Sequence, residues 1–152
     1  MKFLIDTNIL IHYLRQSPLA DYIERTYQPL VPSLTTKPLI SAVIQGELKS
    51  LSLQQNWGEP RKHQLQLLLD KFLVVDIRVE SIINRYAEID AYSQGKLKGR
   101  TFSGSARNMG KNDIWIAATA SVLDATLLTT DKDFDHLNNE FLNVIWLDPS
   151  LN

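Results

Sequence analysis

Short runs of apolar residues alternate along the chain with longer stretches whose apolar positions follow helical spacing. The apolar runs predict strands at residues 3–5, 39–41, 72–75, 126–129 and 144–146. The stretches between them predict helices at residues 8–14, 19–27, 42–53, 79–97, 112–123 and 133–138. Because strands that alternate with helices form βαβ units, we expect an α/β fold, a three-layer α/β/α sandwich with a mainly parallel central sheet.

The region before the fifth of these helices has a distinct composition. Residues 98–110 are predicted to form a loop, because they include three glycines and several small polar residues. Asn112 is the expected N-cap of the helix that follows. That helix, at residues 113–123, is apolar almost all round, which is typical of a helix packed against a sheet and covered on its other side too.

Composition places the chain among ordinary globular domains. With 152 residues it has the usual size of one domain, and we expect residues 1–152 to form a single domain with a substantial core. Hydrophobic residues make up 44% of the chain and charged residues 22%, proportions that argue against disorder. Because the formal net charge is only −1, any surface for nucleic acid must be a local patch.

The chain has no cysteine, which excludes disulfides, thiolate metal sites and a cysteine nucleophile and fits a reducing compartment. The N-terminus reaches Asp6 after three apolar residues, too early for the core of a signal peptide. No apolar run approaches the roughly 20 residues that span a bilayer. We therefore expect a cytoplasmic protein without a membrane partner.

Four acidic residues are placed so that they can meet at one edge of the sheet. Asp6 directly follows the first strand, and Asp131 lies just beyond the strand at residues 126–129. Asp113 begins a helix, and Glu47 lies about one turn into the helix after the second strand. Sites in open parallel sheets form outside the carboxyl ends of the strands, so these distant residues can converge there.

Each acid also has an ordinary structural explanation when it is taken alone. Asp6 could cap the first helix, Asp113 could favour the helix dipole, and Asp131 could belong to a turn. Glu47 could lie on a solvated helix face, as most helical glutamates do. Together, however, four converging carboxylates repel one another and would keep some protons at neutral pH unless a cation lies between them.

The donor atoms indicate which cation fits. Hard oxygen ligands suit Mg²⁺ or Mn²⁺. Zinc is disfavoured, because there is no cysteine and the three histidines are scattered. We assign no role to these histidines, which are His12, His63 and His136.

Four segments resemble the PIN-domain ribonucleases, and among them the VapC-type toxins of bacterial toxin–antitoxin systems. These segments are Leu-Ile-Asp-Thr-Asn at residues 4–8, Gly-Glu-Leu at 46–48, Asn-Asp-Ile-Trp-Ile-Ala-Ala-Thr-Ala at 112–120 and Leu-Thr-Thr-Asp-Lys-Asp-Phe at 128–134. They cover essentially the whole chain in the order of the family. The resemblance implies a PIN-like fold and a metal-dependent endoribonuclease that hydrolyses RNA phosphodiester bonds with one or two Mg²⁺ or Mn²⁺ ions.

The resemblance also implies roles for particular residues. The catalytic acids of the family fall on Asp6, Glu47, Asp113 and Asp131. Asp6 and Asp113 are the expected direct metal ligands, whereas Glu47 and Asp131 would bind the metal or hold water. The expected supporting residues are Thr7, Asn112, Thr130 and, as a possible fifth acid, Asp133.

A basic stretch before the helix at residues 113–123 is a candidate RNA-binding surface. No acidic residue occurs between Ala91 and Asn112, and a glycine-rich basic loop there could hold phosphates near the metal. The alternative is that these are ordinary solvated charges. The loop is longer than in many relatives, which affects the expected substrate preference more than the chemistry. The residues concerned are Lys96, Lys98, Arg100, Arg107 and Lys111.

A toxin of this kind would have a cognate antitoxin protein as partner, and we also expect a homodimer. Residues 12–27 mix apolar and charged side chains and could form a face for either partner. The alternative is that their apolar side chains pack internally.

Three other functions stay open. A haloacid-dehalogenase-like phosphohydrolase also begins with an apolar strand that ends in Asp, but it needs a second Asp two residues later, where this chain has Asn8. A non-catalytic RNA-binding PIN module would have lost its metals, and the presence of all four acids weighs against this alternative. A housekeeping RNA-processing PIN nuclease would share every motif with a toxin, so the sequence does not separate these two roles.

Overall fold

The computed structural model describes residues 1–32 and 37–151. The described chain contains a five-stranded sheet in the order β3-β2-β1-β4-β5. All of its pairings are parallel, so the expected parallel sheet is confirmed. Its strands are β1 (Phe3–Ile5), β2 (Leu39–Ser41), β3 (Leu73–Val75), β4 (Thr126–Thr129) and β5 (Asn143–Trp146).

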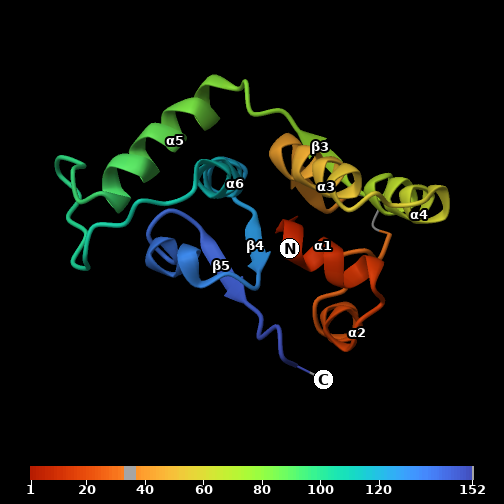
Figure 1. The fold of residues 1–152 in the computed structure, drawn as a ribbon. Coiled ribbons are helices and arrows are strands. Elements are labelled where there is room, and N and C mark those ends of the chain that lie inside the picture. The colour runs from red at the N-terminus through yellow and green to blue at the C-terminus, as the bar shows by residue number, and fades with distance from the viewer. Residues whose placement is uncertain (33–36, 152) are drawn as a thin grey trace.

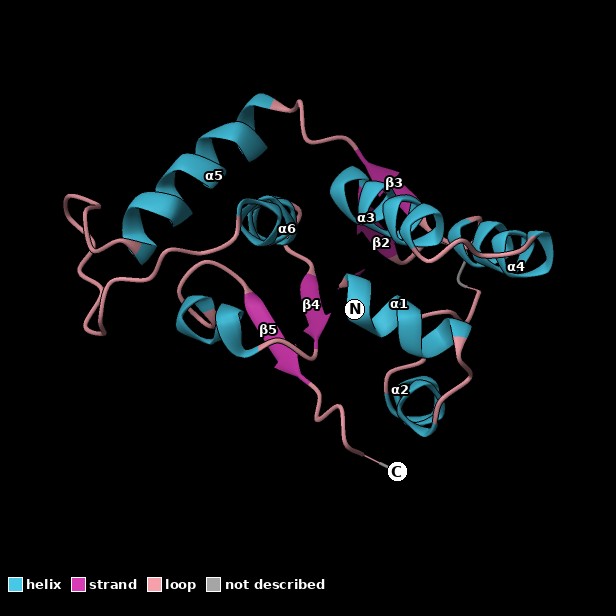
Figure 2. Ribbon diagram, viewed as in Figure 1, coloured by secondary structure: helices cyan, strands magenta, loops and turns pink. Residues whose placement is uncertain are grey.

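Helices cover both faces of the sheet and confirm the three-layer sandwich. Figures 1 and 2 show α5 and α6 on one side and α1, α2 and α4 on the other, while α3 contacts both α1 and α6. The helices are α1 (Thr7–Leu14), α2 (Pro18–Thr26), α3 (Ala42–Gln54), α4 (Glu59–Leu69), α5 (Glu80–Ser93) and α6 (Lys111–Val122), with a 3-10 helix η1 at Lys132–Leu137. None of the helices in the described ranges combines the length and apolarity needed to cross a lipid bilayer.

The main apolar core lies where the central strands meet α6. All residues of β1 and β4 are buried, and so is half of α6. On its outer side α6 packs against α5, where the Trp115 and Tyr86 rings lie 4.2 Å apart. The prediction of a helix covered on both sides is therefore confirmed.

Several boundaries differ from those predicted. The helix α4 was missed, although its buried Leu65, Leu68 and Leu69 follow helical spacing, because the first half of the helix is polar. The N-cap of α6 is Gly110, so the prediction of Asn112 at that position was wrong. Helix α5 ends at Ser93, earlier than predicted, because the chain turns through a left-handed conformation at Gly95.

The candidate partner face at residues 12–27 packs largely internally. Leu19 and Ile23 of α2 are fully or almost fully buried. Tyr27 meets the ring of Phe3 edge to face, with 6.1 Å between the ring centroids. The apolar side chains of this segment are therefore explained by the core.

Candidate metal site at the carboxyl ends of the strands

Asp6 lies at the end of the central strand β1 and is 5% exposed. It is the N-cap of α1, and its Oδ1 accepts a hydrogen bond of 2.8 Å from the backbone N–H of Thr7. Its other oxygen, Oδ2, accepts a hydrogen bond of 2.6 Å from the Thr129 hydroxyl. Asp6 is thus a cap, as one reading of the sequence suggested, but a buried one whose second oxygen faces the neighbouring strand.

Thr129 joins two of the predicted acids. It is fully buried at the end of β4, next to β1 in the sheet. Besides donating to Asp6, its Oγ1 accepts a hydrogen bond of 3.0 Å from the backbone N–H of Asp131. Sequence reasoning missed this residue. Its position at the strand end, two residues before Asp131, is the signal that could have identified it.

Glu47 reaches the same edge from α3. Its Oε1 accepts a hydrogen bond of 3.2 Å from the Thr7 hydroxyl, so Thr7 connects Glu47 with the backbone beside Asp6. Burial raises the pKa of Glu47, the hydrogen bond from Thr7 lowers it, and the charge of Asp6 raises it further. Glu47 therefore lies on a half-buried rather than a freely solvated helix face.

Asp113 lies in the first turn of α6, where the helix dipole favours a negative charge. Even so, its surroundings raise the pKa of Asp113 to about 7. Burial is the largest cause. The remaining causes are the charges of the acids around it, in decreasing order Asp6, Asp131, Asp133 and Glu47. All of the predicted acids thus lie within electrostatic reach of Asp113.

Asp131 and Asp133 come from the turn after β4. Asp131 is the N-cap of η1, and its Oδ1 accepts a hydrogen bond of 2.8 Å from the backbone N–H of Asp133. In the described ranges, one carboxylate oxygen from each of Asp113, Asp131 and Asp133 lies within 4.8 Å of the others. Asp133, although exposed, therefore lies close to both Asp113 and Asp131 and is more than the supporting residue that was expected.

The pKa of Asp6, which is buried in the core, is also changed by burial and by a neighbouring acid. Burial raises the pKa of Asp6, the hydrogen bonds from Thr129 and Thr7 lower it, and the charge of Asp131 raises it. A group of carboxylates with raised pKa values favours bound protons or a bound cation.

The donor set fits a hard divalent cation. The clustered side chains offer carboxylate oxygens, the ligands that Mg²⁺ and Mn²⁺ prefer. Two of the histidines are hydrogen-bonded to serines instead, His12 to Ser17 and His136 to Ser93, both at 2.8 Å. The predicted metal ligands Asp6 and Asp113 lie at the starts of two of the helices that begin at this edge, α1 and α6.

A groove of about 660 Å³ adjoins the acidic cluster between α1 and α3. It is lined at the cluster end by Thr7, Glu47 and Asn112, two of which were predicted as supporting residues. Farther along, its walls are mostly uncharged. Thr130, the third predicted helper, is half-buried, and its carbonyl accepts a hydrogen bond of 2.9 Å from the Trp146 indole N–H.

The predicted basic residues divide into two kinds. Lys96, Lys98, Arg107 and Lys111 are exposed. Arg100 instead lies 3.6 Å from a carboxylate oxygen of Glu140 and stacks 4.0 Å from the ring centroid of Phe141. Its charge is therefore largely used within the fold.

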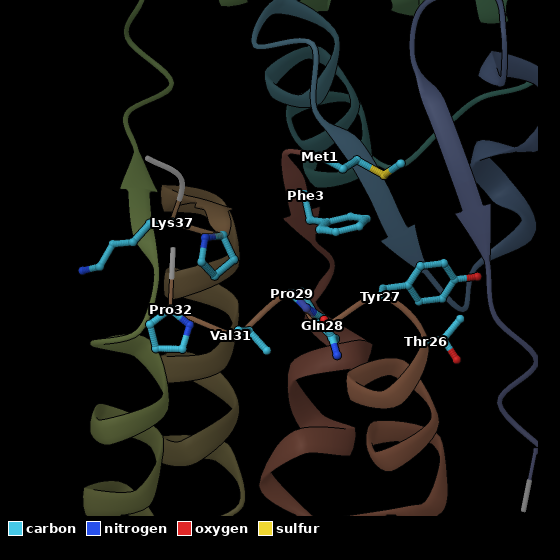
Figure 3. A pocket seen from close by; sticks show the side chains of 10 residues that line it. Met1, Phe3, Thr26, Tyr27, Gln28, Pro29, Val31, Pro32 and Lys37 are labelled. Carbon is cyan, nitrogen blue, oxygen red and sulfur yellow. The ribbon is translucent and has the colours of Figure 1, made fainter. Parts of the chain in front are cut away.

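A second hollow, of about 400 Å³, lies at the opposite edge of the sheet. Figure 3 shows Phe3 and Tyr27 beside it, with prolines and Lys37 completing much of the wall. No acidic side chain lines it within the part of the chain that the structure describes. The clustered acids are thus confined to the carboxyl edge.

A model of the PIN domain family matches residues 3–140. No curated protein sequence matches the chain significantly. Solved structures similar in fold include VapBC2 from Rickettsia felis bound to a DNA fragment from its promoter, with 19% identity, a TM-score of 0.73, and coverage of 97% of this chain and 100% of that chain.

Two further structures give the same result. VapBC-1 from nontypeable Haemophilus influenzae is 24% identical with a TM-score of 0.69, and the match covers 96% of this chain and 98% of that chain. A toxin–antitoxin complex from Klebsiella pneumoniae is 19% identical with a TM-score of 0.66, and the match covers 94% of this chain and 95% of that chain. At these identities the likeness shows the fold alone.

Proposed function

Because the chain belongs to the PIN domain family, we propose that it is a metal-dependent endoribonuclease that hydrolyses RNA phosphodiester bonds. The observation that carries the proposal is the convergence of five acidic side chains at the carboxyl edge of the sheet, where burial and then the charges of the other four acids raise the pKa of Asp113 to about 7. The family match also leaves the phosphohydrolase alternative without support.

A bound Mg²⁺ or Mn²⁺ would supply Lewis-acid activation of water and stabilisation of negative charge on the phosphate. In this proposal Asp6 and Asp113 are the direct ligands. Glu47 and Asp131 complete the ligand set or hold the attacking water. Asp133 contributes a further carboxylate from the rim of the cluster.

The chain's own hydrogen bonds orient these groups. Thr129 fixes one oxygen of Asp6, and the backbone N–H of Thr7 fixes the other. The Thr7 hydroxyl holds Glu47 at the mouth of the groove. Such supporting hydrogen bonds keep ligands in the geometry that a cation needs and so favour binding without rearrangement.

We further propose that the protein is the toxin of a toxin–antitoxin pair, forms a homodimer, and is held inactive by a cognate antitoxin. The fold it shares with chains of VapBC structures and of a toxin–antitoxin complex supports this role. The exposed basic residues beside α6, Lys98 and Lys111 among them, are the proposed phosphate contacts. A housekeeping RNA-processing role is the alternative, and it would use the same site.

Replacing Asp6 with Asn tests the proposed chemistry. We expect RNA cleavage in Mg²⁺ or Mn²⁺ to fall by about 10³-fold or more, since a catalytic metal contributes several kcal/mol. Far-UV circular dichroism should show an unchanged fold. The matched control is Asp21→Asn on the exposed surface of α2, which should cleave at the wild-type rate. Cleavage by Asp6→Asn at the wild-type rate would refute the assignment.

Growth of cells separates a toxin from a processing enzyme. Induction of the wild-type protein should arrest growth, and induction of Asp6→Asn should not. Co-expression of the neighbouring antitoxin gene should relieve the arrest. Normal growth with active wild-type enzyme would favour the housekeeping role.

A further inference from the structure

Trp146 ends β5 at the same edge of the sheet as the acidic cluster. Among the described phenylalanines, tyrosines and tryptophans it is the only one that is exposed, at 37%. The other two tryptophans are used in packing: Trp57 is buried, and Trp115 stacks on Tyr86. Packing of the core therefore does not explain why an indole stands at this surface.

The indole is held beside the acid-bearing turn. Its Nε1–H donates a hydrogen bond of 2.9 Å to the carbonyl of Thr130, the residue directly before Asp131. Trp146 also pairs in register with Thr129, whose hydroxyl binds Asp6. The ring is thus fixed at one edge and open to solvent at the rim of the cluster.

A cation accompanies the ring. The Nζ of Lys132 lies 4.6 Å from the indole centroid, and Lys132 stands in the chain between Asp131 and Asp133. Carboxylates that no cation neutralises repel the phosphates of an RNA strand, so groups around the cluster must contribute to attraction. An aromatic face beside an ammonium offers base stacking and a phosphate contact, the two contacts by which proteins hold single strands.

We propose that Trp146 and Lys132 form a subsite for one unpaired base of a single-stranded RNA, with the indole against the base and the ammonium against a neighbouring phosphate. The proposal rests on the proposed function, because the subsite positions the strand whose backbone the acidic site cuts. It assigns to the end of β5 a role in substrate binding that none of the motifs indicated.

A purely structural role makes a different prediction for conservative replacement. If Trp146 only braces the turn, its hydrogen bond to Thr130 is what matters, and Trp146→Phe should be as harmful as Trp146→Ala. If the ring stacks on a base, Trp146→Phe keeps an aromatic face and should retain most of the affinity.

The test is binding of a short single-stranded RNA to the Asp113→Asn protein, in which cleavage is expected to stop. In this background Trp146→Ala should weaken binding by about 5- to 150-fold, and Trp146→Phe should bind nearly as well as the parent. Lys132→Ala should lower the slope of affinity against salt concentration by about one.

An RNA that lacks one base identifies the partner of the ring. Moving a single abasic position along the strand should find one place where the loss of affinity matches that of Trp146→Ala. The two losses should not add, because both remove the same contact. Tryptophan fluorescence should be quenched by RNA in Trp57→Phe and should no longer respond in Trp146→Phe.

Equal weakening by Trp146→Phe and Trp146→Ala, or wild-type affinity of Trp146→Ala, would overturn the subsite. If every abasic position lowered the RNA affinity of Trp146→Ala still further, no base would be the partner of the ring, and the subsite would be overturned too. The result is separable from the nuclease proposal. Trp146-dependent binding by a protein that cleaves no RNA would refute only the proposed function, whereas cleavage with Trp146-independent binding would refute only the subsite.

Discussion

At the carboxyl edge of the sheet, Asp113, Asp131 and Asp133 form a tight cluster, and Asp6 and Glu47 lie within electrostatic reach of Asp113. At the amino edge, a hollow of about 400 Å³ is instead lined by apolar, polar and proline residues and Lys37. The two regions belong to the same strands. Phe3 begins β1 at one edge, and Asp6 follows its end at the other. Residues that are close in sequence thus belong to very different surfaces at opposite edges of the sheet.

Helix direction explains much of this difference. In a parallel sheet the helices that follow strands begin at the carboxyl edge, and here α1, α3 and η1 begin there with the caps Asp6, Ser41 and Asp131. Their free N–H groups favour negative charge, whereas the helix end at Tyr27 presents carbonyls to the amino edge. The chemistry of the lining, and not the size of a hollow, therefore identifies the candidate site.

The two ends of β4 offer the sharpest test of this contrast, because each carries a threonine. Thr129→Val at the carboxyl end removes the hydrogen bonds to Asp6 and Asp131. We expect a 10- to 100-fold loss of metal affinity or of RNA cleavage, the usual effect of losing a residue that orients a ligand. Cleavage kinetics and Mn²⁺ titration measure it.

Thr126→Val at the amino end is the matched control. It makes the same chemical change in the same strand, and it should leave both metal affinity and activity close to wild type. Equal losses of metal affinity or RNA cleavage in the two variants would mean that the change disturbs the strand as a whole and not the site at its carboxyl end.

The pH dependence of stability gives a second test. The folded protein raises the pKa of Asp113 from 3.8 to about 7, so between these pH values the folded state binds a proton that the unfolded state has released. The free energy of unfolding of the metal-free protein should therefore fall as pH rises from about 4 to about 7 and change little above that for this group. Thermal unfolding in a chelator measures this fall.

Asp113→Asn should flatten that profile, and Mn²⁺ added at pH 8 should raise the unfolding temperature of the wild type but hardly that of the variant. Asp21→Asn, on the exposed surface of α2, should keep the wild-type slope. A metal-free profile that rises with pH would contradict the proposed crowding of charges at the carboxyl edge.

The smallest expected effects concern the basic surface. Lys98→Ala and Lys111→Ala should each weaken RNA binding without regard to sequence and lower the slope of affinity against salt concentration by about one. Lys37→Ala, at the amino-edge hollow, should leave the slope unchanged. If the slope of RNA affinity against salt concentration were the same in all three variants, the basic residues beside α6 would not be specific contacts of the RNA phosphates.

The elements that apolar runs define were predictable from the sequence, and so were the acids at strand ends. Asp6 and Asp131 were identifiable because a parallel sheet brings the ends of β1 and β4 together. Helix α4 was not, because its polar first half hides the helical spacing of Leu65, Leu68 and Leu69.

Contacts that depend on how distant segments align in the fold were also not predictable from the sequence. The hydrogen bond from Thr129 to Asp6 joins residues 123 positions apart, and the pairing of Arg100 with Glu140 joins residues 40 positions apart. A sequence pattern shows neither which side chains face each other across strands nor which charges are already paired. The roles of Thr129 and Arg100 therefore emerge only from the folded chain.

Calorimetric titration of the purified protein with Mn²⁺ tests most directly whether the acidic side chains at the carboxyl edge form a cation site. The wild type should bind Mn²⁺, with affinity that rises by up to about tenfold per pH unit below pH 7 as Asp113 loses its proton. Asp113→Asn should bind far more weakly. Absence of binding heat at several temperatures, together with RNA cleavage that persists in chelator, would contradict the account.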